Sequence, residues 1–385
     1  MRKITYLILV LIFKSFSCTS FACYSEEIWY GMNFDFPQKE MNFSIIDLGD
    51  KKVFRMAFIQ NGKCFVYGYN SDGVLSTVQM RYPQSSFVTP GVDEISFFDA
   101  WIYASHNFTN MNSFKEYLQT GGENGNGIKV VQTPPLTIHT LNVDKTGYGF
   151  VLEDSDNGNE YTEVLDGKLV MSNFLNYQFA GQPYNNVSGV GADRFKYVSE
   201  YLEENFDDFN YDNAWQALQG SIQSSGSYKT LCSSIFDPEN NNIYIVLNRD
   251  FSKIWKISLT SSTIETYSGF ENFWSTSLDD DGISSNTLLS LTDLNEQLPA
   301  KSKLSVYPNP FNPTTTVKYE LTNSSNVLIS IFDSNGSIVK KFNEGFKSIG
   351  KHEITLNCSD FTSGVYYLKL ETLNHNLIKS LTLIK

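Results

Sequence analysis

Cys23 could supply both a nucleophile and a base if it became the first residue of the chain. It follows Ala22, at a position where a secretory signal peptide would be removed. A chain-terminal cysteine carries a thiol with an ordinary pKa of about 8.5 and an α-amine with a pKa of about 8. These two groups are the nucleophile and the proton acceptor that amide cleavage needs. The sequence therefore predicts amide chemistry at Cys23 without a catalytic histidine.

The beginning of the chain has the pattern of a signal peptide. A basic start is followed by an apolar run over Ile4–Phe13 and by small residues at Ser20 and Ala22, which a signal peptidase reads. The apolar run is short for a membrane span. We therefore predict that residues 1–22 are removed, and the alternative is a retained anchor or a lipid-modified Cys23.

Composition restricts the partners of the chain. Its 385 residues are 41% hydrophobic and 15% aromatic, which suits a large core and two or three domains. Residues 1–22 hold three of the 29 basic residues and no acid, so the remainder has 26 basic against 42 acidic residues and a net charge of −16. This charge argues against binding to nucleic acid. No cysteines have CxxC spacing, so we expect no metal and no cofactor.

Strand and helix patterns alternate between Cys23 and about Tyr267. Turn residues such as Asn61-Gly62 separate the strands, and Gly121-Gly122 ends a helix. We expect antiparallel sheets with helices on their outer faces, which is the α+β class. Strands are predicted over 43–48, 53–60, 63–69, 74–81, 136–143, 147–152, 169–172, 231–236, 243–248 and 253–259, and helices over 97–104, 111–119, 193–205 and 211–221.

The end of the chain predicts a separate small β-sandwich. Residues 271–303 have the composition of a linker, and residues 304–385 hold short alternating strands separated by turns. Tyr307–Pro313 (YPNPFNP), Ser363–Tyr367 (SGVYY) and the terminal Lys385 resemble the type A C-terminal sorting domain of the type IX secretion system. The resemblance implies contact with that secretion machinery, export across an outer membrane, and then release or attachment to the cell surface. The alternative is a generic accessory sandwich that binds carbohydrate or a protein partner.

A second resemblance begins at Cys23. This cysteine and Gly31–Phe36 (GMNFDF) are similar to the start of the choloylglycine hydrolase and penicillin V acylase family, whose nucleophile is an N-terminal cysteine. The resemblance implies a four-layer αββα N-terminal nucleophile hydrolase fold over residues 23–270. Four later segments resemble motifs of this family in the same order: Asn70–Val74, Leu169–Asn173, Asp193–Phe195 and Thr230–Asp237.

The resemblance implies a role for each matching residue. Cys23 would be the nucleophile and, through its α-amine, the base. Asp35 would hold that amine, and Arg194 would favour the thiolate electrostatically. The side-chain amide of Asn173 would donate to the oxyanion, together with a main-chain N–H in the Gln79–Arg81 stretch.

Two further residues have supporting roles in this resemblance, and one departs from it. Asn33 would support the strand beside the site, and Asn70 would support a turn. Met32 stands where the family carries an arginine, so the thiol has one cation fewer and depends more on Arg194. The alternative for each polar site residue is an ordinary structural role, such as a strand edge for Asn33 or a surface position for Arg194.

These resemblances predict a secreted N-terminal-cysteine amidase that cleaves linear, nonpeptide amide bonds. Its small-molecule substrate would be an N-acyl compound, such as a conjugated bile salt, penicillin V, an acyl-homoserine lactone or an N-acyl amino acid. Members of the family are often oligomeric, so a homo-oligomer is possible. The alternatives are a catalytically inactive binding protein, in which Met32 marks a lost site, and an acyltransferase that uses an amine acceptor.

Overall fold

The computed structural model describes residues 18–60, 62–123, 125–293, 303–321, 325–347, 350–372 and 376–385. The chain forms two compact units, one of residues 1–263 and 278–288 and the other of residues 264–277 and 289–385. Most of the predicted signal peptide, residues 1–17, lies outside the described residues, as do residues 294–302 of the predicted linker. The start of that predicted linker is structured, because it contains two short strands and a helix.

The first sheet of the larger unit contains the beginning of the described chain. Within the larger unit, its strands run in the order β12-β1-β2-β13-β14-β15, and β1 pairs antiparallel with both β2 and β12. The strand β1 therefore has a neighbour on each side instead of forming a sheet edge. The bounds are β1 (Thr19–Tyr24), β2 (Ile28–Phe36), β12 (Lys168–Met171), β13 (Lys229–Asp237), β14 (Asn242–Leu247) and β15 (Ile254–Ser258).

The second sheet of this unit is also antiparallel and has the order β11-β10-β9-β6-β5-β4-β3-β18. Short turns connect most of its neighbours, and Gly73 has a φ of 85° in the turn after β5, a conformation that favours glycine. The bounds are β3 (Met41–Asp47), β4 (Lys52–Ile59), β5 (Lys63–Asn70), β6 (Leu75–Met80), β9 (Ile138–Val143), β10 (Gly149–Ser155), β11 (Gly158–Glu163) and β18 (Ile283–Ser284).

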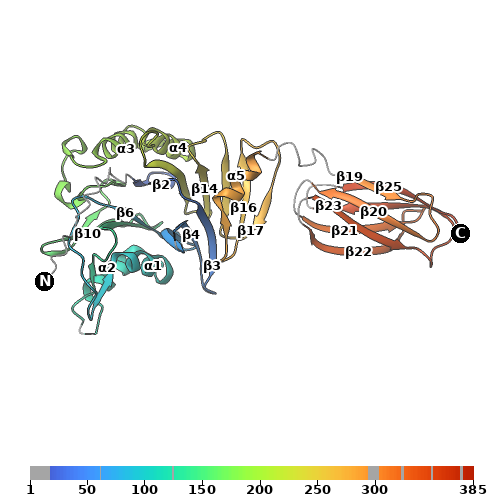
Figure 1. The fold of residues 1–385 in the computed structure, drawn as a ribbon, viewed down its shortest axis with the longest axis horizontal. Coiled ribbons are helices and arrows are strands. Elements are labelled where there is room, and N and C mark those ends of the chain that lie inside the picture. The colour runs from blue at the N-terminus through green and yellow to red at the C-terminus, as the bar shows by residue number, and fades with distance from the viewer. Residues whose placement is uncertain are drawn as a thin grey trace, which may run out of the picture. The chain divides into compact units, whose positions relative to one another are not determined.

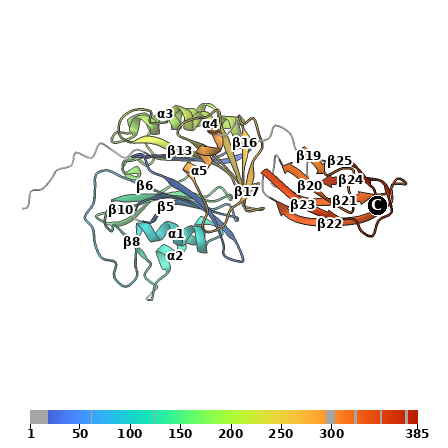
Figure 2. The same ribbon diagram turned by 45° about the vertical axis from the view of Figure 1, so that its right-hand side comes forward.

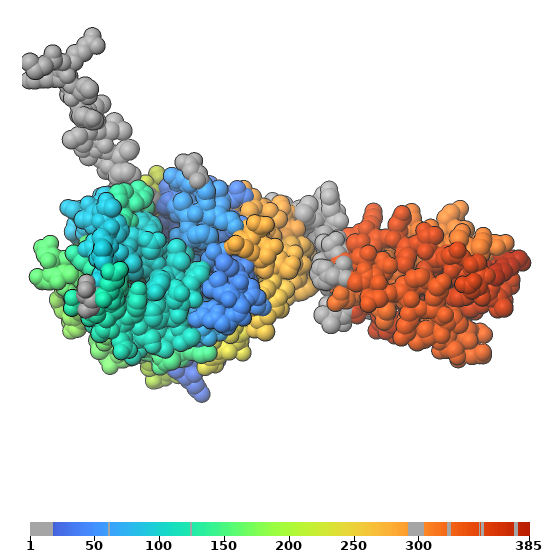
Figure 3. All heavy atoms as spheres, turned by 90° about the horizontal axis from the view of Figure 1, so that it is seen from below, coloured from blue at the N-terminus to red at the C-terminus, as the bar shows by residue number. Residues whose placement is uncertain are grey.

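The two sheets face each other, and helices cover their outer sides (Figures 1 and 2). Buried hydrogen bonds join the facing sides, one between the hydroxyls of Tyr67 and Ser234 at 2.8 Å and one from the Gln79 amide to the Ser20 hydroxyl. Helices α3 (Ala192–Glu204) and α4 (Tyr211–Gly220) contact the first sheet, while α1 (Phe97–Asn107) and α2 (Met111–Thr120) contact the second. Seen from below, the segment that includes α1 and α2, coloured cyan to teal, covers much of this unit (Figure 3).

Local sequence explains where these helices begin. Asn110 accepts a hydrogen bond from the Ser113 N–H at 2.9 Å, and Ser96 accepts one from the Asp99 N–H at 3.0 Å. Such N-caps satisfy main-chain donors that have no partner within the helix. Asn210 forms a reciprocal capping box at the start of α4.

The remaining elements of the chain are short or belong to the smaller unit. Two three-residue strands, β7 (Glu94–Ser96) and β8 (Lys129–Val131), pair in parallel. Short helices are η1 (Asn176–Phe179), η2 (Tyr184–Asn186) and η3 (Phe206–Asp208), and the segment between 263 and 293 forms β16 (Thr263–Ser268), β17 (Ser275–Ser277) and α5 (Ser285–Asp293).

The C-terminal part of the smaller unit is built only of strands in its described residues. Its two sheets have the orders β19-β20-β23 and β22-β21-β24-β25. Val317, Ile329, Leu356 and Leu370 are among the fully buried residues of its core. The bounds are β19 (Lys303–Tyr307), β20 (Thr314–Leu321), β21 (Ser325–Phe332), β22 (Ile338–Lys347), β23 (Gly350–Asn357), β24 (Gly364–Glu371) and β25 (Asn376–Leu383).

The predicted α+β class with large antiparallel sheets and a C-terminal β domain is confirmed. The helices expected over 97–104, 111–119, 193–205 and 211–221 are present, with bounds shifted by up to three residues. The sequence prediction missed β1, because residues 18–22 had been assigned to the signal peptide. In the structure Phe21 and Ala22 are fully buried.

Candidate active site

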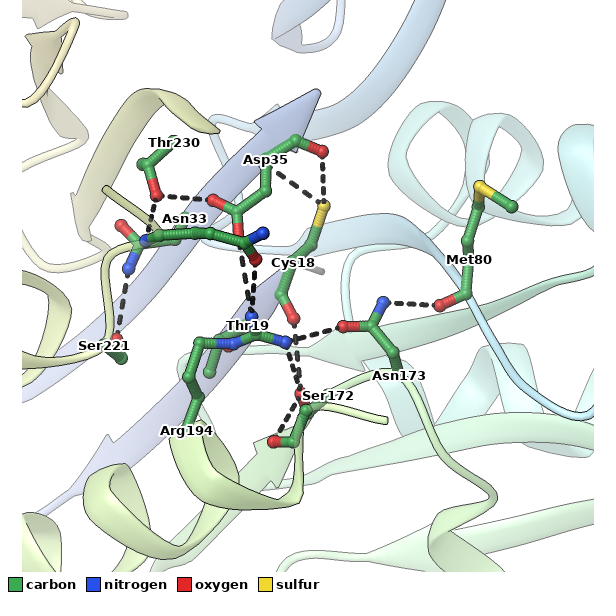
Figure 4. A network of polar contacts seen from close by, with 12 residues as sticks. Cys18, Thr19, Asn33, Asp35, Met80, Ser172, Asn173, Arg194, Ser221 and Thr230 are labelled. Atoms are coloured by element: carbon green, nitrogen blue, oxygen red, sulfur yellow. Dashed lines mark hydrogen bonds and ion pairs between the residues drawn. The ribbon is translucent and has the colours of Figure 1, made fainter. Parts of the chain in front are cut away.

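Cys18 lies directly before β1, and its thiol contacts the main chain of Asp35 in β2. The Sγ atom is 3.5 Å from the Asp35 main-chain nitrogen, which donates to it, and 3.8 Å from the Asp35 carbonyl oxygen. The carbonyl of Cys18 accepts a hydrogen bond from the Ser172 hydroxyl at 3.4 Å. Cys18 is 5% exposed. The structure thus surrounds a buried cysteine with residues predicted for the site (Figure 4).

The carboxylate of Asp35 is buried and only partly satisfied. The hydroxyl of Thr230 donates to Oδ1 at 2.5 Å, whereas Oδ2 has no hydrogen-bond partner among the described residues. Arg194 is the ion-pair partner of Oδ2, with Nη1 3.8 Å away. Burial raises the pKa of Asp35 to about 7, and the charge of Arg194 opposes this rise. One oxygen of Asp35 therefore remains available to accept from a further donor.

Arg194 extends from the first turn of α3 into this cluster. Its Nε donates to Thr19 Oγ1 at 3.1 Å, Nη1 to Gln223 Oε1 at 3.0 Å, and Nη2 to Asn173 Oδ1 at 3.0 Å. Arg194 is 8% exposed. Because a guanidinium has five donors in a fixed plane, these acceptors on three chain segments hold it in one orientation.

The backbone before α3 allows this close approach. Gly191 is the N-cap of α3 and has a φ of 78°. A Cβ atom at this position would collide with the side chains of Ser172 and Arg194. A glycine is therefore required here for two reasons: its backbone is left-handed, and a larger residue would displace the guanidinium of Arg194.

Asn173 follows β12 and has its amide orientation fixed from two sides. Its Oδ1 accepts from Arg194, so its Nδ2 faces the opposite way and donates to the carbonyl of Met80 at 2.6 Å. Met80 lies in the Gln79–Arg81 stretch that was expected to provide a main-chain donor. The N–H of Arg81 already donates to the Thr137 carbonyl at 3.1 Å, so the identity of the main-chain donor stays a prediction.

Asn33 in β2 forms hydrogen bonds with the end of α4 and with β13. Its amide donates to the Leu218 carbonyl at 2.9 Å and to Ser221 Oγ at 3.1 Å, and its Oδ1 accepts from Ser233 at 2.6 Å. These bonds attach the end of α4 to the first sheet. The supporting role of Asn33 in catalysis stays a prediction.

Asn70 and Met32 lie away from the predicted catalytic groups. Asn70 Nδ2 donates to the carbonyl of Ser105 at 2.9 Å, and its Oδ1 accepts from the N–H of Val74 at 3.0 Å, so it fixes the turn after β5 to the end of α1. Met32 is buried in β2 opposite Ser20. Met32 supplies no charge, and burial raises the pKa of the Cys18 thiol although the charge of Arg194 opposes this rise.

Cys23 is separated from the residues predicted to act with it. It lies five positions after Cys18, an odd offset that puts the two side chains on opposite faces of β1. Cys23 is fully buried in a hydrophobic cluster that includes Val198 and Leu202 of α3 and Leu218 of α4. No hydrogen bond or ion pair links it to Asp35, Asn173 or Arg194 in the described part of the chain. The geometry therefore brings Asp35, Asn173 and Arg194 together, but around Cys18 instead of Cys23.

Both thiols have pKa values above the ordinary range in the chain as described. Burial raises the pKa of the Cys18 thiol to about 12, and the nearby Asp35 contributes to this rise. Burial also raises the pKa of the Cys23 thiol to about 12. In the described structure Cys18 is bonded to residue 17, so it has no free α-amine. A thiol in this state is protonated at neutral pH and is a weak nucleophile.

An apolar cavity of about 420 Å³ opens beside Cys18. Its walls come from β2, β4, β5, β6 and the segment before β9. Cys18 and Asp35 are among its lining residues, and most of the lining surface is apolar. The lining residues besides these two are Phe34, Phe36, Phe58, Cys64, Phe65, Val66, Val78, Gln79, Met80, Phe98, Thr133, Pro134, Pro135, Leu136 and Ile138.

No group of three or more His, Cys, Asp and Glu side chains in the described residues could hold a metal ion. No helix in this part of the chain has both the length and the apolar character needed to cross a membrane. All five cysteines are free thiols.

Comparison with known proteins identifies the C-terminal part. Residues 305–384 match the secretion system C-terminal sorting domain. The match confirms the predicted sorting tail and, with it, the expectation of an exported protein at the cell surface or outside the cell. A search of the curated proteins finds no match for the chain.

Solved structures similar to this chain include enzymes of the two kinds named by the sequence resemblance. Two variants of the conjugated bile acid hydrolase from Clostridium perfringens are each 18% identical, with a TM-score of 0.48, and cover 65% of this chain and 97% and 96% of their own. Penicillin V acylase from Agrobacterium tumefaciens is 14% identical, with a TM-score of 0.44, and covers 65% of this chain and 90% of its own.

Proposed function

We propose that this protein is an exported N-terminal-cysteine amidase that hydrolyses linear, nonpeptide amide bonds of N-acyl compounds, and that Cys18 is its nucleophile. The observation that carries the proposal is the contact of a buried thiol with Asp35, whose second carboxylate oxygen has no hydrogen-bond partner in the described structure. A free α-ammonium on Cys18 would supply the hydrogen-bond donor that this oxygen lacks. Asn173 and Arg194 are the other two proposed site residues, and Arg194 donates a hydrogen bond to Asn173.

The choice of Cys18 over Cys23 follows from the role of β1. Cleavage after Ala22 would remove Thr19–Ala22, four of the six residues of a strand that pairs on both sides. Cleavage after Ser17 would keep the whole strand. Ser15 and Ser17 are small residues at the positions that a signal peptidase reads, so the sequence also permits this cut.

The proposed reaction uses only groups of this chain. The α-amine of Cys18 takes the thiol proton, and the sulfur attacks the amide carbon to form a carbon–sulfur bond. Asn173 donates to the oxyanion, and Arg194 holds its amide in the orientation that permits this. The α-ammonium protonates the leaving amine, and water then hydrolyses the thioester to give a carboxylic acid and the free thiol. The 420 Å³ apolar cavity beside Cys18 would hold the acyl group.

The architecture supports the same proposal at the level of the fold. Two facing antiparallel sheets with outer helices fit the αββα arrangement of N-terminal nucleophile hydrolases. The first compact unit would be the hydrolase domain, and residues 304–385 would interact with the type IX secretion machinery. Removal of the signal peptide during export would then also release the α-amine of the nucleophile.

The test is a panel of N-acyl amides incubated with secreted protein whose N-terminus has been established by intact mass and sequencing. We expect an N-terminus at Cys18 and release of free amine from at least one class of substrate. Added amine acceptors would reveal an acyltransferase by formation of a new amide. No labelling of Cys18 by a thiol-directed acylating probe would instead favour a noncatalytic binding protein, in which Met32 marks the lost site.

Stability should depend on pH through Asp35 in a chain that keeps residue 17. The folded-state pKa of Asp35 is about 7, above its ordinary value of about 4, so the folded protein binds this proton more tightly than the unfolded one. The free energy of unfolding should therefore fall as the pH rises from about 4 to about 7, by up to about 4 kcal/mol, and the cost should be complete above pH 7.

Chemical denaturation of this chain and of its Asp35→Asn variant between pH 4 and pH 8 measures the effect. The difference between the two proteins isolates Asp35 from neighbouring groups such as Arg194 and Arg249. A free α-ammonium at Cys18 should lower the pKa of Asp35 and reduce the fall. Identical pH profiles for the parent and Asp35→Asn would contradict the shifted pKa.

A further inference from the structure

Arg81 lies just after β6, and its side chain is almost completely buried. Its guanidinium is held by Asp154 in β10, with Nη2 2.6 Å and Nε 3.2 Å from Oδ1. It also donates to the Pro83 carbonyl at 2.6 Å and to the Ser85 hydroxyl. The side chain of Arg81 is 2% exposed and that of Asp154 is 20% exposed. Burying such a pair is costly, and loss of one partner leaves an uncompensated charge.

Asp154 connects this arginine to a second segment. Its Oδ1 accepts from Gln132 Nε2 at 2.6 Å. The same amide group donates to the Ile138 carbonyl at 2.7 Å and accepts from the Ile138 N–H at 3.0 Å. Gln132 thus ties together the two ends of the segment 133–137. Although burial tends to raise it, the pKa of Asp154 is lowered by these hydrogen bonds and by the charge of Arg81, which keeps the carboxylate ionised.

The segment 133–137 forms one wall of the cavity beside Cys18. Thr133, Pro134, Pro135 and Leu136 all line it. Thr137, the last residue of the segment, has two further contacts. Its carbonyl accepts a hydrogen bond from the Arg81 N–H, and its hydroxyl accepts one from the Ser85 N–H. The donors in these two contacts are Arg81 itself and Ser85, whose hydroxyl accepts from the Arg81 guanidinium.

We infer that Arg81, Asp154 and Gln132 form a clamp that sets the position of the 133–137 wall and thereby the selectivity of the cavity for the acyl group. These three are positioning residues, because they act through the wall. The inference deepens the proposed function and rests on it. A wall fixed by buried ionic and amide contacts has a defined distance from the thiol, whereas a loop without them would adapt to acyl groups of different width.

The experiment compares Asp154→Asn with the parent enzyme on two amides of one chromogenic amine, carrying a straight octanoyl or an aromatic phenylacetyl group. We expect KM for the preferred acyl group to rise about tenfold while kcat changes less than about threefold, so that the preference between the two falls by a similar factor. Asp154→Glu, which keeps the charge, should recover part of the preference. Unchanged KM values and an unchanged preference in Asp154→Asn would overturn the clamp.

A binding measurement separates the clamp from the proposed function. In a Cys18→Ala background, the Kd of a fluorescent fatty acid should rise about tenfold with Asp154→Asn or with Gln132→Met, a change of similar shape. Asp72→Asn is the matched control, since Asp72 pairs with the buried Lys51 at 3.2 Å and does not line the cavity. Equal Kd values in all four proteins would overturn the clamp, whether or not the parent cleaves any amide.

Discussion

Replacing Cys18 with alanine is expected to lower amide cleavage by at least about a thousandfold, whereas replacing Cys23 should leave the rate within about threefold. Cys18 contacts Asp35 and lies beside the apolar cavity. Cys23 packs among side chains of α3 and α4 on the other face of β1. Loss of the sulfur at Cys18 removes the atom that forms the acyl-enzyme, and loss of the sulfur at Cys23 removes only packing contacts.

The two variants are matched controls for each other, because each removes one buried thiol from the beginning of the chain. The free energy of unfolding should fall by about 1 to 2 kcal/mol in Cys23→Ala, as for a small buried side chain. Amine release measures the cleavage rate, and thermal unfolding measures stability. Mass mapping after labelling with iodoacetamide shows which thiol is reactive. An active Cys18→Ala protein would show that Cys18 is not the nucleophile. Labelling confined to Cys23 would favour Cys23 as the nucleophile.

Local chemistry explains why so much of the first unit could be predicted. Capping by Asn110 and termination at Gly121 define α2, and both signals lie within the helix's own neighbourhood in sequence. The separate predictions of Asp35, Asn173 and Arg194 came from short motifs, and the fold brings these three side chains together. The motifs therefore name three side chains that the fold places in contact, and their catalytic roles stay a prediction.

The position of the nucleophile could not be read in the same way. An apolar run followed by small residues resembles the end of a signal peptide, but Thr19–Ala22 is equally a buried strand. Which cysteine contacts the main chain of Asp35 depends on the register of β1 against β2, and this register is known only once the strand and its neighbours are known. The choice between two candidates five residues apart thus depended on pairing with β2 and β12.

The clamp on the cavity wall depends on contacts between residues that are far apart in the sequence. Arg81 and Asp154 are 73 positions apart in the sequence, and neither belongs to a motif. Only the pairing of β6 with β9 and of β9 with β10 brings them together. Sequence spacing carries no signal for such a contact, so the side-chain contacts that hold the cavity wall were not predicted.

A chain that keeps one residue before Cys18 is expected to lose at least about a thousandfold in amide cleavage while it remains folded. An amide nitrogen at this position can neither take the thiol proton nor pair as a cation with Asp35. Burial then leaves the thiol with a pKa of about 12, so almost none of it is ionised at neutral pH. Two proteins test this, one beginning at Cys18 and one beginning with glycine before Cys18, each defined by intact mass and assayed for amine release.

Asp35→Asn in both proteins shows whether the α-amine acts through this carboxylate. In the protein that begins at Cys18, the substitution should lower kcat/KM by about 10- to 100-fold, because the ammonium loses its counter-charge. In the glycine-extended protein it should have little further effect, since no ammonium is present to be held. Equal activity of the two parent proteins would exclude the α-amine as the base, and equal losses on Asp35→Asn would assign Asp35 a role that does not depend on the amine.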